Sequence, residues 1–366
     1  MKWCKPDYKR SGLNVISSIS GHLGFPLPYA SYPELDALLN DKQYRNIVLV
    51  LLDGMSMEIM RTHLKEDAFL RRYADMTLTT VYPSTTPNAT SCLETGCSPR
   101  EHGWLGWTLY FKQLEKPVDI FINRSNGEPA ADYHVANRFI PREMIFSKIS
   151  AAGQAKANCI SRFTDDIKVD TLEEALDTAV RLAKDEERRY LYVYWSEPDH
   201  SMHTLGYDHP DITERLLDLN AKMEKLAADL PKDSLLLVTA DHGMINARHL
   251  YLEDHPDVEA MLVHPPTIEA RAAAFHVKPE CLSAFPGAFR NAFGENFLLM
   301  DRETFIRDYL GDGPVRPQVY DFVGDYMALA TDLDSICHRH EDFKLTGMHG
   351  GLTEQEMLVP LIVFGK

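Results

Sequence analysis

Largely apolar runs of seven or eight residues recur along the chain, separated by longer mixed segments. They span Asn46–Leu52, Arg189–Trp195, Ser234–Ala240 and Met357–Phe364. Uninterrupted apolar runs of this length are typical of strands buried on both faces, as in parallel sheets. Further strands are expected at Leu78–Tyr82 and Lys156–Ile160.

Between these runs the apolar positions follow the 3.6-residue period of a helix. In Thr171–Arg188 they fall at 172, 175, 176, 179, 182 and 183, and Asp211–Leu230 has the same spacing. Shorter helices are expected at Met57–Leu64 and Met144–Ala152. Alternating strands and helices predict an α/β fold, a three-layer α/β/α sandwich with a mostly parallel central sheet.

Residues 257–340 break this alternation. Strands are expected there at Thr267–Val277 and Asn296–Met300, and helices at Cys281–Phe293 and Thr304–Leu310. We interpret this segment as a small inserted α+β cap subdomain, with residues 1–256 and 341–366 forming the catalytic core. Residues 107–143 are irregular and predict a strand or hairpin plus a long loop over one rim.

Composition narrows the class of protein. The chain has 366 residues, 45% of them hydrophobic, and a formal net charge of −16. This charge argues against binding a nucleic-acid polymer or an anionic membrane, although bound metal ions would still admit a small anionic substrate. The first residues lead into no apolar stretch of signal-peptide length, and the six cysteines form no CxxC pair. We therefore expect a soluble cytoplasmic protein with a small-molecule partner, its oligomeric state open.

The stretch around Thr86 combines hydroxyl groups with a helix start. Pro83 is followed by Ser84, Thr85 and Thr86, and Pro87 then opens a segment that reaches Thr95 and Gly96. Threonine is a good N-cap, proline suits the first helical position and glycine suits the stop. We expect Thr86 to cap this helix, where a phosphate can dock and a hydroxyl can attack it. A strand-to-helix junction of this kind is also ordinary in α/β proteins.

Polar residues follow several of the predicted strands. In parallel sheets ligands bind at the carboxyl ends of the strands, so these side chains are expected at one rim. The set comprises Asp53, Thr86, Asp199, His203, Asp241, His242 and His349. Each position alone has a plainer interpretation, such as a strand-ending turn for Asp53 or a surface location for His203. Together these oxygen and nitrogen donors suit two zinc ions, which can clamp the attacking and leaving oxygens in phosphoryl transfer.

The motifs also resemble a known family. The series LVLLDG, PSTT, TG then HG, PDHSMH, TADHGM and GMHGG is similar to the alkaline phosphatase superfamily, in particular its type I phosphodiesterase / nucleotide pyrophosphatase branch. The resemblance covers about residues 45–106, 190–245 and 345–366. It implies an alkaline-phosphatase-like fold.

The resemblance also implies the roles of individual residues. Thr86 stands three residues after Pro83 and nine before Thr95, as the family's threonine nucleophile does, which favours it over Thr85. The family pattern then implies two divalent metal ions, zinc first and manganese as the alternative. One ion would be held by Asp199, His203 and His349, and the other by Asp53, Asp241, His242 and the Thr86 oxygen.

Two features depart from related patterns. The family's asparagine, which steadies a phosphoryl oxygen, is replaced by Trp107, and Asn88 is the nearest alternative amide. The segment Cys97-Ser98-Pro99-Arg100 resembles the sulfatase CxPxR motif but is one residue short and follows the helix, so we reject a sulfatase.

The predicted function is therefore a metal-dependent hydrolase, a phosphodiesterase or nucleotide pyrophosphatase acting through phospho-threonine. Alternatives are a phosphomonoesterase or phosphonate hydrolase at the same site, and a non-catalytic metal-binding protein. The aromatic residues of the 104–133 region could line a leaving-group pocket or simply pack; they are Trp104, Trp107, Tyr110, Phe111 and Tyr133.

Overall fold

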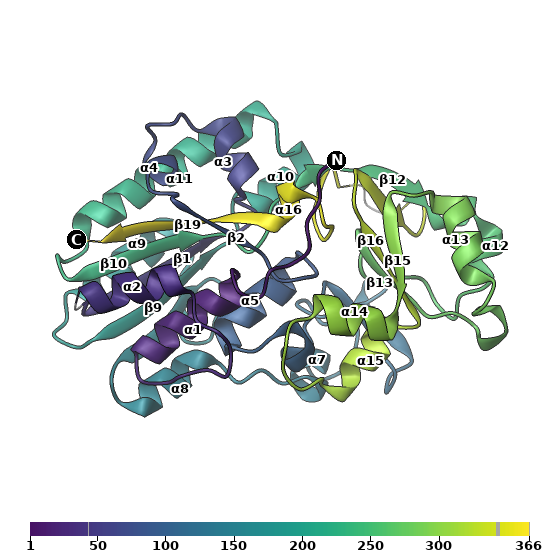
Figure 1. Cartoon of the computed structure of the whole chain (residues 1–366), viewed down its shortest axis with the longest axis horizontal. Coiled ribbons are helices and arrows are strands. Elements are labelled where there is room, and N and C mark those ends of the chain that lie inside the picture. The colour runs from purple at the N-terminus through teal and green to yellow at the C-terminus, as the bar shows by residue number, and fades with distance from the viewer. Residues whose placement is uncertain (43, 342–344, 366) are drawn as a thin grey trace.

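The computed structural model describes residues 1–42, 44–341 and 345–365. Figure 1 shows two lobes side by side, each built on its own sheet. Residues 342–344 and 366, which fall within the predicted core segment 341–366, lie outside the described residues. Among the residues that are described, no helix combines the length and apolar character needed to cross a bilayer.

The first lobe holds a seven-stranded sheet. Its order is β2 (Met76–Thr79), β19 (Leu358–Gly365), β10 (Ser234–Thr239), β1 (Asn46–Leu52), β9 (Arg189–Trp195), β7 (Lys156–Ser161) and β8 (Ile167–Lys168). Strands β10, β1, β9, β7 and β8 pair in parallel, whereas β19 runs antiparallel to β2 and β10. Every residue of β1 and β10 is buried, as the apolar runs predicted.

Helices cover both faces of this sheet. One face carries α1 (Gly12–His22), α2 (Pro33–Asp41), α5 (Thr86–Thr95) and α8 (Ile145–Ala152), and the other carries α3 (Met57–His63), α4 (Phe69–Arg72), α9 (Leu172–Ala183) and α11 (Pro210–Asp229) (Figure 1). The predicted α/β/α sandwich with a mostly parallel central sheet is confirmed.

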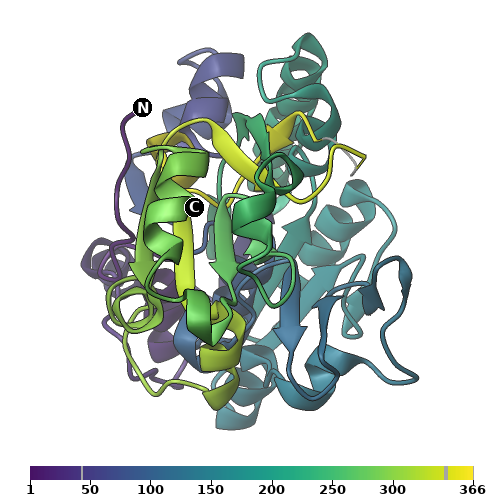
Figure 2. The same cartoon turned by 90° about the vertical axis from the view of Figure 1, so that its right-hand side faces the viewer.

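The second lobe holds an antiparallel sheet of eight strands. Its order is β15 (Phe297–Asp301), β16 (Tyr326–Ala330), β14 (Ala272–Phe275), β13 (Thr267–Glu269), β3 (Thr108–Phe111), β4 (Lys116–Asp119), β5 (Arg124–Ser125) and β6 (Glu128–Pro129). Figure 2 shows the blue strands of the 108–129 segment alongside the green strands of the later segment. The irregular stretch before the helix α7 (Val135–Phe139) therefore builds half of this sheet.

Short elements complete the two lobes. The second carries α12 (Pro256–Glu259), α13 (Phe285–Phe293), α14 (Arg302–Tyr309), α15 (Pro317–Val323), η1 (Leu252–Asp254), η2 (Pro279–Cys281) and the pair β12 (Arg248–Tyr251) and β17 (Asp334–Cys337). Nearer the first sheet lie α6 (Pro99–His102), α10 (Asp199–Leu205), α16 (Glu354–Met357) and the pair β11 (Ile245–Asn246) and β18 (Gly347–Met348).

Some predicted boundaries were wrong. The strand expected at Thr267–Val277 is a hairpin of β13 and β14, and the helix expected at Thr171–Arg188 ends at Ala183. The strand expected at Leu78–Tyr82 is β2, which spans Met76–Thr79. Its pairing with β19 ends where Thr79 pairs with Leu358. Beyond it, the Thr80 hydroxyl donates to the carbonyl of Asp241.

Candidate metal and nucleophile site

The polar residues predicted from the sequence meet at the carboxyl ends of the central strands. Asp53 follows β1 directly, and Asp241 and His242 come just after β10. Asp199 and His203 lie on α10, which follows β9, and His349 follows β18. The carboxyl edge of a mostly parallel sheet is where such folds bind ligands.

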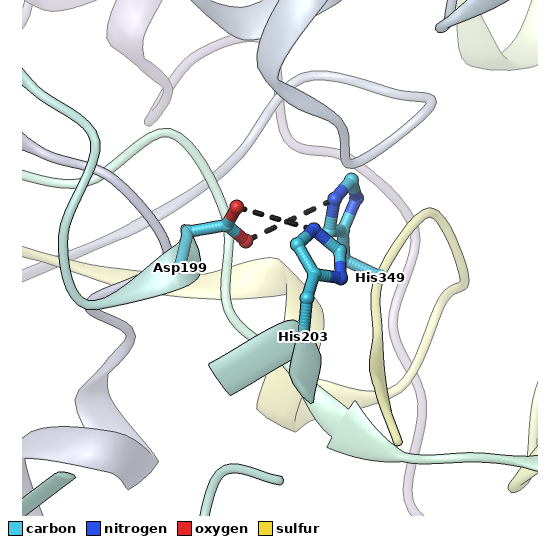
Figure 3. Close-up of side chains that lie close together, drawn as sticks. All are labelled: Asp199, His203 and His349. Carbon is cyan, nitrogen blue, oxygen red and sulfur yellow. Dashed lines mark ion pairs between the residues drawn. The ribbon is translucent and has the colours of Figure 1, made fainter. Parts of the chain in front are cut away.

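Asp199, His203 and His349 form the first cluster, shown in Figure 3. The Nε2 atom of His203 lies 3.2 Å from Oδ2 of Asp199, and Nε2 of His349 lies 3.9 Å from Oδ1 of the same carboxylate. The four-residue spacing of Asp199 and His203 places both on one side of α10. One carboxylate thus faces two imidazole nitrogens, a donor set typical of zinc sites.

A second cluster surrounds His242. Its Nε2 atom lies 3.5 Å from Oδ1 of Asp53 and 3.5 Å from Oδ2 of Asp241. The hydroxyl oxygen of Thr86 lies 3.1 Å from the same nitrogen and 3.4 Å from Oδ2 of Asp53. The rings of His242 and His349 stack with centroids 3.9 Å apart, so the two clusters adjoin. All seven predicted residues are therefore brought together.

The three histidines share one orientation. In each, Nδ1 contacts a main-chain carbonyl oxygen, which leaves Nε2 facing the carboxylates. The carbonyls belong to Gly347 for His203, Gly243 for His242 and Ser84 for His349, at 2.8, 2.9 and 3.3 Å. A carbonyl oxygen only accepts, so each contact assigns a proton to Nδ1, and in the neutral ring Nε2 then carries the lone pair, as in metal-ligating histidines.

Two carboxylate oxygens test whether cations fit here. Oδ1 of Asp199 and Oδ2 of Asp241 are buried and accept no hydrogen bond from any described residue. A buried carboxylate oxygen without a partner is costly. Burial, reinforced by the charges of Asp241 and Asp199, also raises the pKa of Asp53 well above its ordinary value. Bound cations would relieve both penalties, so the residues fit a metal centre.

Charge also sets the proton state of the first cluster. Burial opposes the protonated imidazole of His203, but the adjacent Asp199 carboxylate outweighs it and raises the pKa of His203 to about 9. Burial, followed by the charge of His242, lowers the pKa of His349 well below its ordinary value. A metal ion in this cluster would therefore compete with a proton on His203 and not on His349.

The sequence matches the model of a known enzyme family. The model of the type I phosphodiesterase / nucleotide pyrophosphatase family matches residues 47–287, well over half of the chain. The chain belongs to this family. As a member of the type I phosphodiesterase / nucleotide pyrophosphatase family, within the alkaline phosphatase superfamily, the protein is a phosphoryl-transfer hydrolase of phosphoester or phosphoanhydride bonds. No curated protein matches this sequence significantly.

Solved structures of similar fold include animal and bacterial enzymes. Murine ectonucleotide pyrophosphatase / phosphodiesterase 5 is 19% identical, with a TM-score of 0.67 over 87% of this chain and 88% of that chain. The human enzyme of the same name gives 0.64 at 19% identity, over 87% of each chain. Phosphonoacetate hydrolase from Sinorhizobium meliloti 1021, solved with phosphonoformate, gives 0.64 at 17% identity, over 87% of this chain and 90% of that chain.

The N-cap of α5 is not the residue that the sequence predicted, which was Thr86. The N-cap residue is Thr85, and Thr86 is the first residue of the helix, followed by Pro87. The correction arises because the Thr85 carbonyl, not that of Thr86, accepts the first helical hydrogen bonds, from Asn88 and Ala89. The main-chain N–H of Thr86 has no partner among the described residues. It remains available to an anion at the positive end of the helix.

Two residues beside the site escaped the sequence analysis. The Tyr194 hydroxyl donates to Oδ2 of Asp53 at 2.5 Å, from the end of β9. Glu269, the last residue of β13, accepts from the Thr85 hydroxyl at 2.6 Å. Burial raises the pKa of Glu269. Nothing in the local sequence marks either residue, because both reach the site through pairing between distant segments.

A buried ion pair lies beside the loops of His242 and His349. Arg271 and Glu356 have fully buried side chains and pair through two contacts, at 2.7 and 2.8 Å. Glu356 also accepts from the main-chain N–H of Gly351, two residues after His349, at 2.7 Å. Its own carbonyl accepts from the N–H of Gly243 at 2.8 Å. The pair thus joins the second sheet to both loops that carry the neighbouring histidines.

Several residues singled out in the sequence have other environments. Trp104 and Phe111 are buried in the second lobe, where they pack, whereas the side chain of Trp107 is 42% exposed. The side-chain amide of Asn88 donates to the carbonyl of Pro83 at 2.8 Å, so it stabilises the turn before α5. Cys97 follows the far end of α5, away from Thr86.

Proposed function

We propose that this family member is a two-metal phosphodiesterase in which Thr86 is the nucleophile. The observation that carries the proposal is the position of the Thr86 hydroxyl, 3.1 Å from His242 and 3.4 Å from Asp53 at the start of α5. A hydroxyl there lies beside metal-ligating groups and beside a free main-chain N–H.

The proposed ligand sets follow the two clusters. Asp199, His203 and His349 would hold one ion. Asp53, Asp241, His242 and the Thr86 oxygen would hold the other. The mixed nitrogen and oxygen donors, the inward Nε2 lone pairs and the unpartnered carboxylate oxygens support zinc, with manganese as the alternative.

The proposed reaction has two displacements at phosphorus. The Thr86 oxygen forms a bond to phosphorus as the bond to the leaving alcohol breaks, which gives phospho-threonine. Water then attacks the same phosphorus from the opposite side and releases Thr86. The two ions would stabilise the alkoxide and the charge on the leaving oxygen. The Thr86 N–H is available to donate to a non-bridging oxygen during both steps.

A second activity at the same site is favoured by one observation. Trp107 occupies the position of the family's asparagine, and its exposed indole offers no amide to a phosphoryl oxygen. Hydrolysis of phosphomonoesters or phosphonates is therefore the alternative. In either case we propose a small molecule as substrate, a phosphate ester or, in the alternative, a phosphonate, since the net charge of −16 disfavours a nucleic-acid polymer.

The test compares two chromogenic esters in the presence of zinc. Hydrolysis of bis-(4-nitrophenyl) phosphate and of 4-nitrophenyl phosphate is measured for the wild type, Thr86→Ala and Thr95→Ala. Thr95 is a matched control because its hydroxyl bonds within the same helix, to the carbonyl of Ser91. We expect faster diester hydrolysis that Thr86→Ala abolishes and Thr95→Ala retains. Undiminished activity in Thr86→Ala would refute the nucleophile, and a monoester preference would favour the alternative.

A further inference from the structure

Glu269 brings a carboxylate from the second lobe to the residue that precedes the proposed nucleophile. Its Oε1 atom accepts from the Thr85 hydroxyl at 2.6 Å and from the main-chain N–H of Trp107 at 2.9 Å. Trp107 is the position at which the family pattern has an amide donor. In related proteins a side-chain donor at this position is expected to reach the phosphoryl group. Here the Glu269 carboxylate, an acceptor, is bound to the main chain of that position.

The backbone holds Glu269 in place at a cost. Ile268, immediately before it, has φ of 76°, in the left-handed region that β-branched residues avoid. Ile268 is buried against Gly106, where an added Cβ would lie 2.7 Å from Cγ2 and from the carbonyl oxygen of Ile268. Such strain persists only where the surrounding packing fixes the conformation, and it gathers at functional sites. The close fit of Gly106 and Ile268 fixes the direction in which Glu269 leaves β13.

The second oxygen of Glu269 is not used by the fold. Oε2 makes no hydrogen bond to any described residue, whereas Oε1 makes both of the bonds given above. The side chain also passes the loop after His349, because an added Cβ on Gly350 would lie 3.1 Å from the Cβ of Glu269. One oxygen is thus anchored, and the other has no partner among the described residues, which leaves it available to a substrate.

We propose that Glu269 is a specificity-determining residue of this site, which disfavours dianionic phosphoryl groups and accepts a phosphodiester whose substituent donates a hydrogen bond. This inference rests on the proposed function and assigns it a substrate class. A phosphodiester carries one negative charge, whereas a phosphomonoester or phosphonate carries up to two at pH 8. At a separation on the order of 8 Å and an effective dielectric of about 20, one extra like charge weakens binding by roughly 30-fold.

The first experiment changes the charge and keeps the shape. Glu269→Gln retains an oxygen that can accept from the Trp107 N–H, and Asp119→Asn is the matched control. Asp119 accepts from the Thr108 hydroxyl at 2.6 Å on the next strands of the same sheet. The kcat/KM values for bis-(4-nitrophenyl) phosphate, 4-nitrophenyl phosphate and 2-aminoethyl 4-nitrophenyl phosphate are measured at pH 8 with zinc.

We expect Glu269→Gln to lower the diester-to-monoester ratio at least 10-fold and to remove any advantage of the aminoethyl ester, with Asp119→Asn unchanged. A ratio that stays within 2-fold of the wild type would overturn the role of Glu269, while Thr86-dependent turnover would leave the proposed function standing. Thr85→Val separates charge from structure, because it removes the anchoring hydroxyl and keeps the carboxylate. It should preserve the discrimination, and a fall equal to that of Glu269→Gln would also overturn the proposal.

A binding measurement needs no turnover. Calorimetry of the zinc-loaded protein compares inorganic phosphate with dimethyl phosphate, the monoanion. Glu269→Gln should tighten phosphate binding at least 10-fold and change dimethyl phosphate binding less than 3-fold. If the wild type shows no Thr86-dependent hydrolysis, the proposed function fails, and this comparison alone decides on Glu269. Equal effects of the substitution on both anions would refute the charge argument.

Discussion

The buried pair of Arg271 and Glu356 offers the sharpest prediction about how the fold supports the site. Both carboxylate oxygens of Glu356 are used: Oε1 accepts from Arg271 and the Gly351 N–H, and Oε2 accepts from Arg271 and the Thr353 hydroxyl. Gly351 is also pressed against the pair, since an added Cβ would lie 2.7 Å from Nη2 of Arg271. Removing one partner leaves a charge that is fully buried and cannot reach water.

Glu356→Gln should therefore lower the free energy of unfolding of the metal-free protein by about 3–5 kcal/mol, the usual cost of breaking a buried ion pair. Urea unfolding followed by tryptophan fluorescence measures this loss. Arg290 and Glu295 form a matched surface pair, with side chains 68% and 80% exposed. Glu295→Gln should cost less than about 1 kcal/mol.

The same substitution should also weaken zinc binding by at least about 10-fold, because Glu356 anchors the loops after His349 and His242. Zinc titration with a competing chelator measures this second effect. A loss of stability below about 1 kcal/mol for Glu356→Gln would refute the account of the pair. Full stability loss with unchanged zinc affinity would show that the pair supports the fold without positioning the ligands.

Three further predictions concern the proposed metal ligands and a tyrosine beside them. His349→Ala should reduce bound zinc from two ions per chain to one, measured by elemental analysis after dialysis, and two retained ions would exclude His349. The zinc affinity of the first cluster should rise about tenfold per pH unit from pH 7 to about 9, because the metal must displace the proton that Asp199 stabilises on His203. Calorimetry in buffers of different ionisation enthalpy should find about one proton released per zinc bound. A pH-independent affinity would contradict this prediction. Tyr194→Phe removes the hydrogen bond to Asp53 and should weaken metal binding about 10-fold with little loss of stability, so unchanged affinity would make that bond incidental.

Much of the site could be predicted because its residues follow strands that are recognisable on their own. Asp53 and Asp241 come directly after apolar runs that form β1 and β10. The carboxyl ends of parallel strands meet at one edge, so these positions converge independently of the structure of the other segments. The helical spacing of Asp199 and His203 is equally local.

Glu269 could not be predicted, because its position depends on pairing between distant segments. β13 pairs with β3 through Ile268 and Thr108, which are far apart in the sequence. A turn between β13 and β14, and a positive φ at a β-branched residue, are not visible in hydrophobic periodicity. The N-cap is Thr85 and not Thr86 because the Thr85 carbonyl accepts the first helical hydrogen bonds, while the Thr85 hydroxyl is bound to Glu269 and makes no capping hydrogen bond.

The place of β19 in the first sheet has a consequence for synthesis. It lies between β2 and β10, so the final strand of the described chain is inserted into the interior of the sheet and not added at its edge. At ribosomal rates of about 5–20 residues per second, the segment that forms β19 is synthesised roughly 6–25 s after the segment that forms β10. The loop of His349 and the carboxylate of Glu356 emerge in the same interval. Removal of residues 358–365 should therefore leave β2 and β10 without their shared neighbour, and the shortened protein should bind chaperones.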